Sequence, residues 1–286
     1  MKVLNFGSLN IDNVYCLPHI VRPGETISAV SNAVFAGGKG LNQSIAIARA
    51  GVRVYHAGMI GRDGIFLKNL LEENGVDCTF LDVSEDVPSG NALIQVADDG
   101  ENSIVLFGGA NQSIKKEKAA GVLADFEAGD IAVLQNEISV TSDVIYEAHK
   151  RGLRVFFNPA PMSDDVADFP LELVDTLIVN ETEMAELKKR RSQLDFCNLL
   201  LTMGSKGAAY YPKNNGEKIF VPACKVEKVV DTTGAGDTFI GYFVAETAKG
   251  LPTEVCLRHA ACAAAKSITK AGAAVSIPKI DELDFS

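Results

Sequence analysis

The sequence lacks several features that would place the protein in a particular class. It contains no tryptophan, and its six cysteines are scattered along 286 residues without a C-x-x-C pair. No apolar run approaches the ~18 residues that a membrane-spanning helix needs. The N-terminus also lacks the charged and apolar regions of a signal peptide. We therefore expect a cytoplasmic protein with reduced cysteines, no zinc site and no membrane partner.

The chain also lacks an excess of basic residues. Its 27 Lys and Arg face 37 Asp and Glu, which gives a formal net charge of −10. Nucleic-acid binding calls for a basic face, so no nucleic-acid partner is expected. With 47% apolar residues the chain is not disordered. Its length allows one large domain or two small ones.

Neither of the common glycine motifs for nucleotides is present. Gly38-Lys39 is followed by Gly40 where a P-loop has Ser or Thr, and Ala33 stands where its first glycine belongs. Gly234-Ala235-Gly236 has Phe239 at the third glycine position of a Rossmann fingerprint, and it lies far from the first predicted strand. The sequence therefore argues against both of these nucleotide-binding folds.

What the sequence does contain is an alternation of short β-branched apolar runs with helical patterns. This alternation predicts an α/β fold, a doubly wound and mostly parallel sheet with helices on both faces. The expected strands are Val3–Gly7, Arg53–Ile60, Ile131–Gln135, Leu153–Phe157, Thr176–Val179 and Leu199–Thr202, with a hairpin over Ala208–Val221. The expected helices are Leu41–Ala50, Gly64–Asn74, Ser142–Arg151, Glu181–Lys189, Gly234–Lys249 and Thr253–Lys270, of which the last two are apolar all round.

Two segments interrupt the alternation. Residues 13–31 contain Pro18, Pro23 and Gly24, and residues 89–107 have the pattern of a hairpin that turns at 98–100. Neither segment fits between the helices of a doubly wound sheet. We predict that they form a small β-sheet that projects as a lid from a single domain spanning residues 1–286.

The clearest candidate site is the segment Asp231-Thr232-Thr233-Gly234-Ala235-Gly236-Asp237-Thr238-Phe239, which opens a long predicted helix. Small residues let a ligand approach the backbone closely. A helix N-terminus offers unpaired N–H groups and a positive dipole end, which suit a phosphate. Asp237 would lie beside that anion. Its alternative role is that of an acidic residue that only stabilises the helix dipole.

Three further segments place polar residues beside predicted strands or helices. Gly37-Gly38-Lys39-Gly40 with Asn42 opens a helix, and it is either a ligand-binding stretch or a flexible turn with a solvated lysine. Asn180-Glu181-Thr182-Glu183 follows a buried strand, where it forms a capping box, a ligand site, or both. Its carboxylates could hold Mg²⁺ through waters. Residues 202–207 form either a nucleotide-binding turn or a plain turn.

These motifs, in this order, resemble the ribokinase family of carbohydrate and nucleoside kinases over nearly the whole chain. Residues 37–40 with Asn42 match the first family signature, and residues 231–239 match the second. The resemblance implies a ribokinase-like fold and ATP-dependent transfer of the γ-phosphoryl group to a sugar hydroxyl, with the 5-hydroxyl of ribose favoured. Fructose, 2-keto-3-deoxygluconate and adenosine are the alternative acceptors. A catalytically silent sugar-binding protein is a further alternative.

The resemblance also implies roles for individual residues. Asp237 would be the general base, and the N–H groups of Gly234, Ala235 and Gly236 would form an anion hole. The sugar would be bound by Asn10, Asp12, Gly38, Lys39, Asn42 and Glu137, a mixture that suits hydroxyl groups. The nucleotide would be bound by Asn180, Thr202, Gly204, Lys206, Gly207 and His259, although a lone histidine in an Ala-rich helix is often structural.

The implied cofactors are ATP, Mg²⁺ and K⁺. Glu183 would organise Mg²⁺ through water. A monovalent cation would lie near Asp231, Thr233, Ser267, Lys270, Gly272 and Ser276, in part through backbone carbonyls. A projecting sheet has open edges, and the resemblance implies that two copies pair through them as a homodimer. The chain departs from the family at 190–198, where a longer insert is usual, and we interpret the basic residues 188–191 as a solvated helix end.

Overall fold

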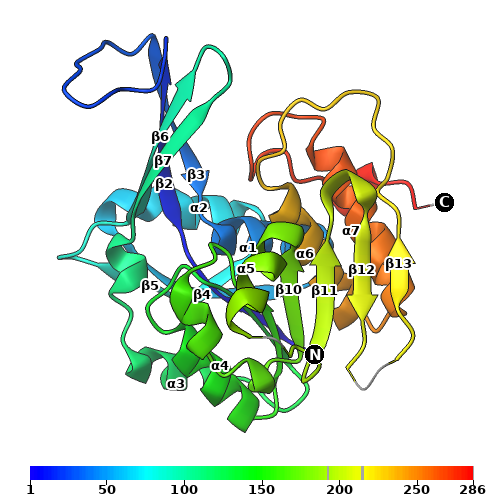
Figure 1. Ribbon diagram of the computed structural model, residues 1–286. Helices are drawn as coiled ribbons and strands as arrows, with labels where there is room; N and C mark the ends of the chain where they lie inside the picture. The colour runs from blue at the N-terminus through cyan, green and yellow to red at the C-terminus, as the bar shows by residue number, and fades with distance from the viewer. Residues whose placement is uncertain (192, 214–215, 286) are drawn as a thin grey trace.

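Residues 1–191, 193–213 and 216–285 are described by the computed structural model, and they form a nine-stranded sheet and a separate four-stranded sheet (Figure 1). The strands of the large sheet run in the order β13-β12-β11-β10-β9-β8-β1-β4-β5, and all are parallel except β12 and β13. They are β1 (Val3–Phe6), β4 (Val54–Gly61), β5 (Asp77–Ser84), β8 (Ile131–Gln135), β9 (Arg154–Asn158), β10 (Thr176–Asn180), β11 (Asn198–Thr202), β12 (Ala208–Tyr211) and β13 (Ile219–Val221).

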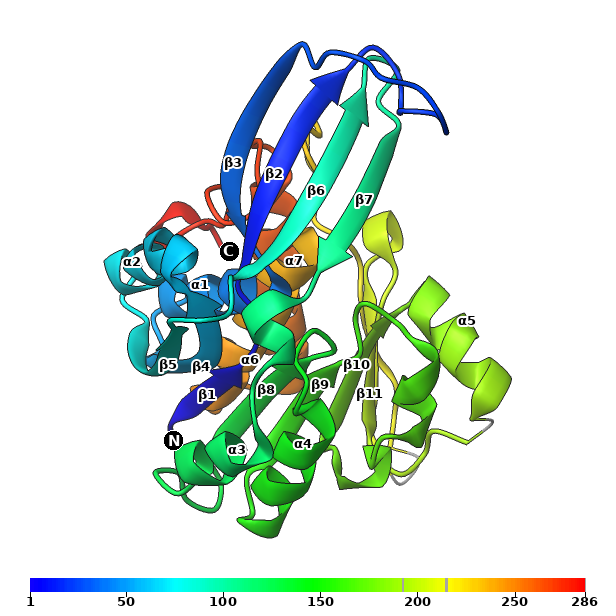
Figure 2. The same cartoon turned by 90° about the vertical axis from the view of Figure 1, so that its left-hand side faces the viewer.

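Helices cover both faces of the large sheet (Figures 1 and 2). Side chains of a strand alternate between its two faces, so Val3 of β1 packs into one core and Leu4 and Phe6 pack into the other. The predicted doubly wound α/β fold is therefore confirmed. The helices are α1 (Lys39–Arg49), α2 (Ile65–Glu73), α6 (Ala235–Ala248) and α7 (Thr253–Ser267) on the first face, and α3 (Lys116–Leu123), α4 (Thr141–Lys150) and α5 (Glu181–Arg190) on the second.

The small sheet stands away from the large one (Figure 2). Its order is β3-β2-β6-β7, from β2 (Asn10–Leu17), β3 (Ser31–Gly37), β6 (Gly90–Ala97) and β7 (Asn102–Phe107). The expected hairpin at 89–107 supplies β6 and β7. The expected excursion at 13–31 is too narrow, because β2 begins at Asn10 and β3 continues to Gly37, where the chain enters α1.

The other expected elements appear with ends shifted by up to three residues, and β3, β5 and α3 are additional. Residues 214 and 215 of the expected hairpin, residue 192 of the shortened segment and residue 286 of the expected domain lie outside the described residues. All six cysteines are free, although the Sγ atoms of Cys224 and Cys262 lie 2.7 Å apart. Within the described part of the chain, no helix is long and apolar enough to cross a membrane.

Candidate functional site

The candidate site lies where the strand order of the large sheet reverses. From β1 the chain continues to β4 and β5 on one side and then returns to β8 on the other. In open α/β sheets, ligands bind in the crevice beyond the carboxyl ends of the strands at this point. Ser8 follows β1 and Glu137 follows β8, and the Ser8 hydroxyl donates a hydrogen bond to Glu137 Oε2. The topology therefore places Glu137, one of the predicted sugar ligands, at the crevice.

The glycine-rich start of α1 is closely packed against this crevice. A Cβ added at Gly37 would lie 2.0 Å from Asp12 Oδ2, and one added at Gly40 would lie 2.4 Å from the backbone nitrogen of Ser8. Gly38 has a φ of 95°, which favours glycine. The packing favours the binding interpretation of this segment over a flexible turn, because Lys39 is half-buried and its backbone N–H donates to Glu137 Oε2 at 3.0 Å.

One ammonium group lies among several carboxylates in this crevice. The carboxylates of Asp237 foremost, and of Glu137 and Glu183, raise the pKa of Lys39 against the effect of burial. Burial raises the pKa of Glu137, and burial together with Glu137 raises the pKa of Asp12 to about 6. The site therefore combines one fixed positive charge with acceptors that suit hydroxyl donors.

Asp237 lies in the first turn of α6 and faces α1. Its side chain is buried, with 7% exposed. Asn42 Nδ2 donates a hydrogen bond to Asp237 Oδ2 at 3.0 Å, and Gln43 Nε2 donates one to Asp237 Oδ1 at 3.0 Å. A role in the helix dipole alone explains neither the burial nor these two bonds. Asp237 is a carboxylate whose two oxygens are held by a neighbouring helix.

One of the three backbone N–H groups in the predicted anion hole already has a partner within the chain. The Ala235 N–H donates to the Thr232 carbonyl at 3.2 Å, so this group is occupied within the chain. Gly234 is in the left-handed region, with φ 74°. A Cβ at Gly236 would meet nothing within 4 Å. Because packing does not require glycine at Gly236, the open space above it is available to a ligand.

The predicted nucleotide residues lie mostly at the ends of β10 and β11, where Asn180 pairs in register with Thr202. The capping box is confirmed: Glu183 N–H donates to Asn180 Oδ1 at 2.8 Å, and Asn180 N–H donates to Glu183 Oε2 at 2.9 Å. Burial raises the pKa of Glu183, and the fields of Lys39 and Asp237 also act on it. Glu183 thus caps α5 and faces the crevice. The turn at Gly204, Lys206 and Gly207 follows β11, and Lys206 Nζ lies 2.9 Å from Glu181 Oε1.

His259 contacts residues that are not among the other predicted nucleotide ligands. Its Nδ1 lies 3.2 Å from Glu246 Oε2. Its ring stacks on the ring of Phe285 with centroids 3.7 Å apart. These contacts lend support to the structural interpretation of this histidine, whose nucleotide role stays a prediction.

The predicted cation residues come from two loops that are tied together. Asp231 Oδ1 accepts hydrogen bonds from the N–H and hydroxyl of Thr233, and its Oδ2 accepts one from the Gly272 N–H at 2.8 Å. Burial acts to raise the pKa of Asp231, but these bonds outweigh it and the pKa is lowered. The Lys270 ammonium, which pairs with Glu282, has no lone pair, so Lys270 can offer a cation only its backbone carbonyl. The remaining two side chains, Ser267 and Ser276, bond to nearby backbone carbonyls.

Among the described residues, no group of three or more His, Cys, Asp or Glu side chains could hold a metal ion. A divalent cation would therefore rely on Glu183, waters and the phosphates of a bound ligand, as Mg²⁺ commonly does. An alkali cation near Asp231 would rely on backbone oxygens. The residues present fit both ions in these modes.

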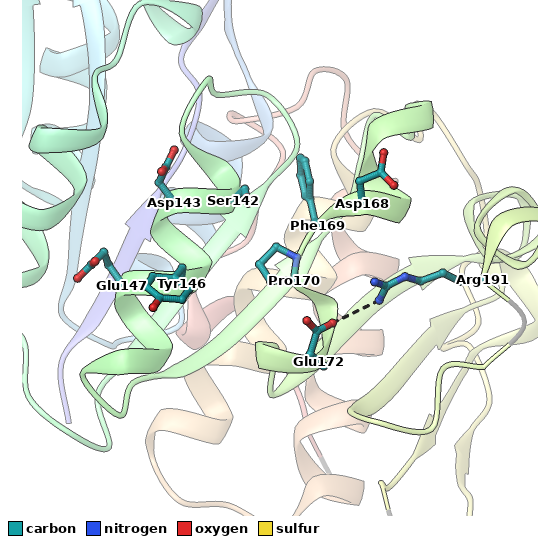
Figure 3. A pocket seen from close by; sticks show the side chains of 9 residues that line it. All are labelled: Ser142, Asp143, Tyr146, Glu147, Asp168, Phe169, Pro170, Glu172 and Arg191. Atoms are coloured by element: carbon teal, nitrogen blue, oxygen red, sulfur yellow. Dashed lines mark ion pairs between the residues drawn. The ribbon is translucent and has the colours of Figure 1, made fainter.

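A separate pocket of about 430 Å³ lies between α4 and the loop before β10 (Figure 3). Tyr146, Phe169 and Arg191 line it, and Arg191 pairs with Glu172 at 3.5 Å. None of the predicted site residues lines this pocket. The basic residues 188–191 are exposed or half-buried, and three of them pair with carboxylates, as expected for a solvated helix end.

Three site residues that the motifs did not indicate are Asn5, Gln43 and Gln135. They are buried amides at positions that otherwise read as apolar core. Their only signal in the sequence is an amide within or at the end of an apolar strand or helix face. They connect Asp237 to the interior, as described below.

Comparison with known proteins gives a consistent set of relatives. The model of the pfkB family of carbohydrate kinases matches residues 1–280. The ribokinase of Haemophilus influenzae is 33% identical over 298 residues, which cover 98% of this chain and 96% of that protein. The ribokinase of Cryptococcus neoformans in complex with ADP superposes with a TM-score of 0.88 at 36% identity, covering 98% of both chains. The ribokinase of Arabidopsis thaliana complexed with ribose and ATP superposes with a TM-score of 0.87 at 30% identity, covering 97% of this chain and 96% of that one.

Proposed function

Since the chain belongs to the pfkB family of carbohydrate kinases, and is therefore an ATP-dependent sugar kinase, we propose that it phosphorylates ribose at the 5-hydroxyl. The products are ribose 5-phosphate and ADP. Support for the sugar comes from ribokinases that match nearly the whole chain, one of them complexed with ribose and ATP. The alternative acceptors are fructose, 2-keto-3-deoxygluconate and adenosine.

The observation that carries the proposal is the placement of Asp237 beside Lys39 and the open backbone at Gly236. Asp237 accepts the proton of the sugar hydroxyl while the hydroxyl oxygen forms a bond to the γ-phosphorus and the bond to ADP breaks. The N–H groups of Gly234 and Gly236 stabilise the charge on the transferring phosphoryl group. Ala235 takes part only if its bond to Thr232 opens.

The sugar is bound by Asn10, Asp12, Gly38, Lys39, Asn42 and Glu137. Asn42 supports this assignment because its Nδ2 is committed to Asp237, while its buried Oδ1 has no hydrogen-bond partner among the described residues. A buried acceptor without a partner favours a ligand that brings a donor, and a sugar hydroxyl is such a group. Asp12 and Glu137 accept from further hydroxyls.

The nucleotide is bound by Asn180, Thr202, Gly204, Lys206, Gly207 and His259. Mg²⁺, held through water at Glu183, neutralises phosphate charge when bound. Backbone oxygens near Asp231 and Thr233, where the two loops meet, would hold K⁺. The cation there strengthens the positive field at the start of α6.

Two copies of the chain pair through the small sheet. Val34, Leu93 and Val105 lie in one row across β3, β2, β6 and β7, with Asn13 of β2 between Val34 and Leu93, on the face opposite to Asp12. They are 55%, 41% and 60% exposed. A second copy would cover this apolar strip and the open edges of the sheet. The sheet acts as a lid over the sugar.

The experiment is a coupled assay of ADP release with ATP and Mg²⁺, on a panel of ribose, fructose, 2-keto-3-deoxygluconate and adenosine, with and without K⁺. We expect the highest kcat/KM for ribose and a higher rate with K⁺. Asp237→Asn is the control, because loss of the base should lower kcat by at least ~10²-fold and leave ribose binding intact. Absence of ribose turnover would overturn the substrate, and near-normal turnover by Asp237→Asn would overturn the base.

A further inference from the structure

A row of buried amide side chains connects Asp237 to the protein interior. Gln43 Nε2 donates to Asp237 Oδ1, and Gln135 Nε2 donates to Gln43 Oε1 at 2.7 Å. Gln135 Nε2 also donates to Asn5 Oδ1 at 3.0 Å, and Asn5 Nδ2 donates to the Gly40 carbonyl at 2.8 Å. The three amide residues are at most 1% exposed, so the row is shielded from water.

The direction of each amide follows from the chemistry at the end of the row. The Gly40 carbonyl can only accept, so Asn5 turns its NH₂ group toward it and its oxygen toward Gln135. The Asn5 oxygen can only accept, so Gln135 presents its NH₂ group to both Asn5 and Gln43. Gln43 then accepts through its oxygen and has only its NH₂ group to offer Asp237.

This order of donors and acceptors determines which hydrogen bonds the Asp237 carboxylate can make. Asn42 and Gln43 each offer it an N–H donor, so both oxygens of Asp237 must accept. Hydrogen bonds of this kind are stronger to an ionised acceptor than to a neutral one. We propose that Gln43 and Gln135 are positioning residues that direct an N–H donor at Asp237 and fix the direction of its carboxylate before the sugar binds. This inference rests on the proposed role of Asp237 as the base.

The direction of the hydrogen bonds along the row leaves one buried polar atom of Gln135 without a partner in the described part of the chain. Gln135 Nε2 donates to Asn5 and to Gln43, and in this orientation its buried Oε1 has no hydrogen-bond partner among the described residues. Turning the amide over would give Oε1 two acceptors as neighbours. The observed direction is therefore the one that keeps every other contact of the row matched.

The charged groups around Asp237 act in opposite senses. Lys39 on α1 favours the ionised carboxylate, while Glu137 after β8 and Glu183 on α5 disfavour it. At the far end of the row, Asn5 Nδ2 also donates to Ser44 Oγ at 2.8 Å, and Ser44 Oγ lies 2.8 Å from His56 Nδ1. Burial lowers the pKa of His56 to about 4. His56 is therefore neutral near pH 7 and adds no charge. The amides add direct hydrogen bonds to the carboxylate, which these charged groups do not make.

The test compares the pH dependence of kcat in Gln43→Met, Gln135→Met and the double variant. Loss of a charge-assisted hydrogen bond should move the acidic limb of the profile to higher pH by about one unit in Gln43→Met. Gln135→Met should give a smaller shift in the same direction. The double variant should shift no further than Gln43→Met, because both residues act through one bond. Ribose Kd, measured by calorimetry, should change less than about threefold in each variant.

Asn158→Leu is the matched control. Asn158 is a buried amide on β9, paired in register with Gln135, and it donates to the Ile178 carbonyl outside the row. Its loss should lower the melting temperature and leave the pH profile unchanged. If Gln135→Met does not fold, Gln135→Asn keeps a buried amide that is too short to reach Gln43 and should give the same shift.

Unshifted profiles in the Gln43 and Gln135 variants, with turnover still abolished by Asp237→Asn, would overturn the positioning role and leave the proposed function intact. Additive shifts in the double variant would also overturn it. Near-normal turnover by Asp237→Asn would instead overturn the assignment of the base.

Discussion

At the scale of single residues, Asp12 is a proposed sugar ligand whose burial also destabilises the folded protein. Burial, together with Glu137, raises its pKa from 3.8 to about 6. Between these values the folded protein holds a proton that the unfolded chain has released. The free energy of unfolding therefore falls as pH rises through this window, and the cost persists above pH 6.

We predict that Asp12→Asn raises the melting temperature at pH 7.5, because the buried charge is removed. The gain should disappear below about pH 4, where both states of the parent carry the proton. The same variant should raise the KM for ribose at least about tenfold, through loss of a charged acceptor. Thermal melts across pH and steady-state kinetics check both effects. An unchanged melting temperature at pH 7.5 would contradict the cost assigned to Asp12.

The motifs identified Asp237 and Lys39, because each lies in a local pattern with a physical meaning. They did not identify Gln43 and Gln135, which are 92 residues apart and meet only after the sheet has formed. The sequence around each residue does not determine which of these amides donates a hydrogen bond and which accepts it. The sequence also does not predict the contacts of His259. Its ring stacks on Phe285, and this contact depends on where the C-terminal segment lies in the folded chain.

At the scale of elements, the contact between α1 and the segment after β1 allows little change. A Cβ at Gly40 would lie 2.4 Å from the backbone nitrogen of Ser8 and 2.6 Å from the carbonyl carbon of Gly7. We predict that Gly40→Ala lowers the free energy of unfolding by about 1–3 kcal/mol, because backbone must move. Urea unfolding measures the change.

Gly121→Ala is the control for this prediction. Gly121 lies within α3, is exposed, and a Cβ there would meet nothing within 4 Å. The alanine should stabilise the protein by about 0.5–1 kcal/mol through helix propensity. A Gly40→Ala variant as stable as the parent would show that the close approach is not required.

The small sheet supplies a second prediction at this scale. Saturating ribose should slow amide hydrogen exchange in residues 13–31 and 89–107, because the lid becomes ordered over the sugar. Exchange in α3 (Lys116–Leu123), on the far face of the large sheet, is the internal reference. Unchanged exchange in both lid segments would show that the sheet is not a lid.

The sequence predicts best the strands and helices in which the pattern of apolar residues follows the burial of their faces. The buried strands and the helices of the large sheet have such patterns. β5 was missed because it is an edge strand with mixed burial, so its alternation is weak. β3 was missed because its first five residues are exposed, and nothing in their pattern distinguishes a strand from a loop.

At the scale of the whole molecule, the apolar strip on the small sheet predicts the oligomeric state. Light scattering should give a mass twice that of the chain. Val105→Glu should yield the monomer, because it places a charge within the strip. Tyr146→Glu, at an exposed residue of α4 away from the small sheet, should leave the mass unchanged. A monomeric parent would remove the proposed homodimer.

The negative net charge of the chain is compatible with a phosphate ligand. A phosphate at the start of α6 meets backbone N–H groups and a helix dipole, which carry partial positive charge whatever the sum over the surface. The lack of a basic excess argues against a nucleic-acid partner, but this reasoning does not extend to ATP. The relevant field is local to the residues around Gly236.

The small sheet is joined to the rest of the molecule at the site itself. β2 begins at Asn10, four residues after β1 ends, and β3 ends two residues before α1 begins at Lys39. In the proposed role as a lid, the small sheet would pivot about residues that we propose bind the sugar. β2 extends about 26 Å from that pivot, so a small rotation at its foot becomes a large displacement at its tip. A sugar of the wrong shape could then be rejected through the angle of the sheet, without any contact between that sugar and the tip.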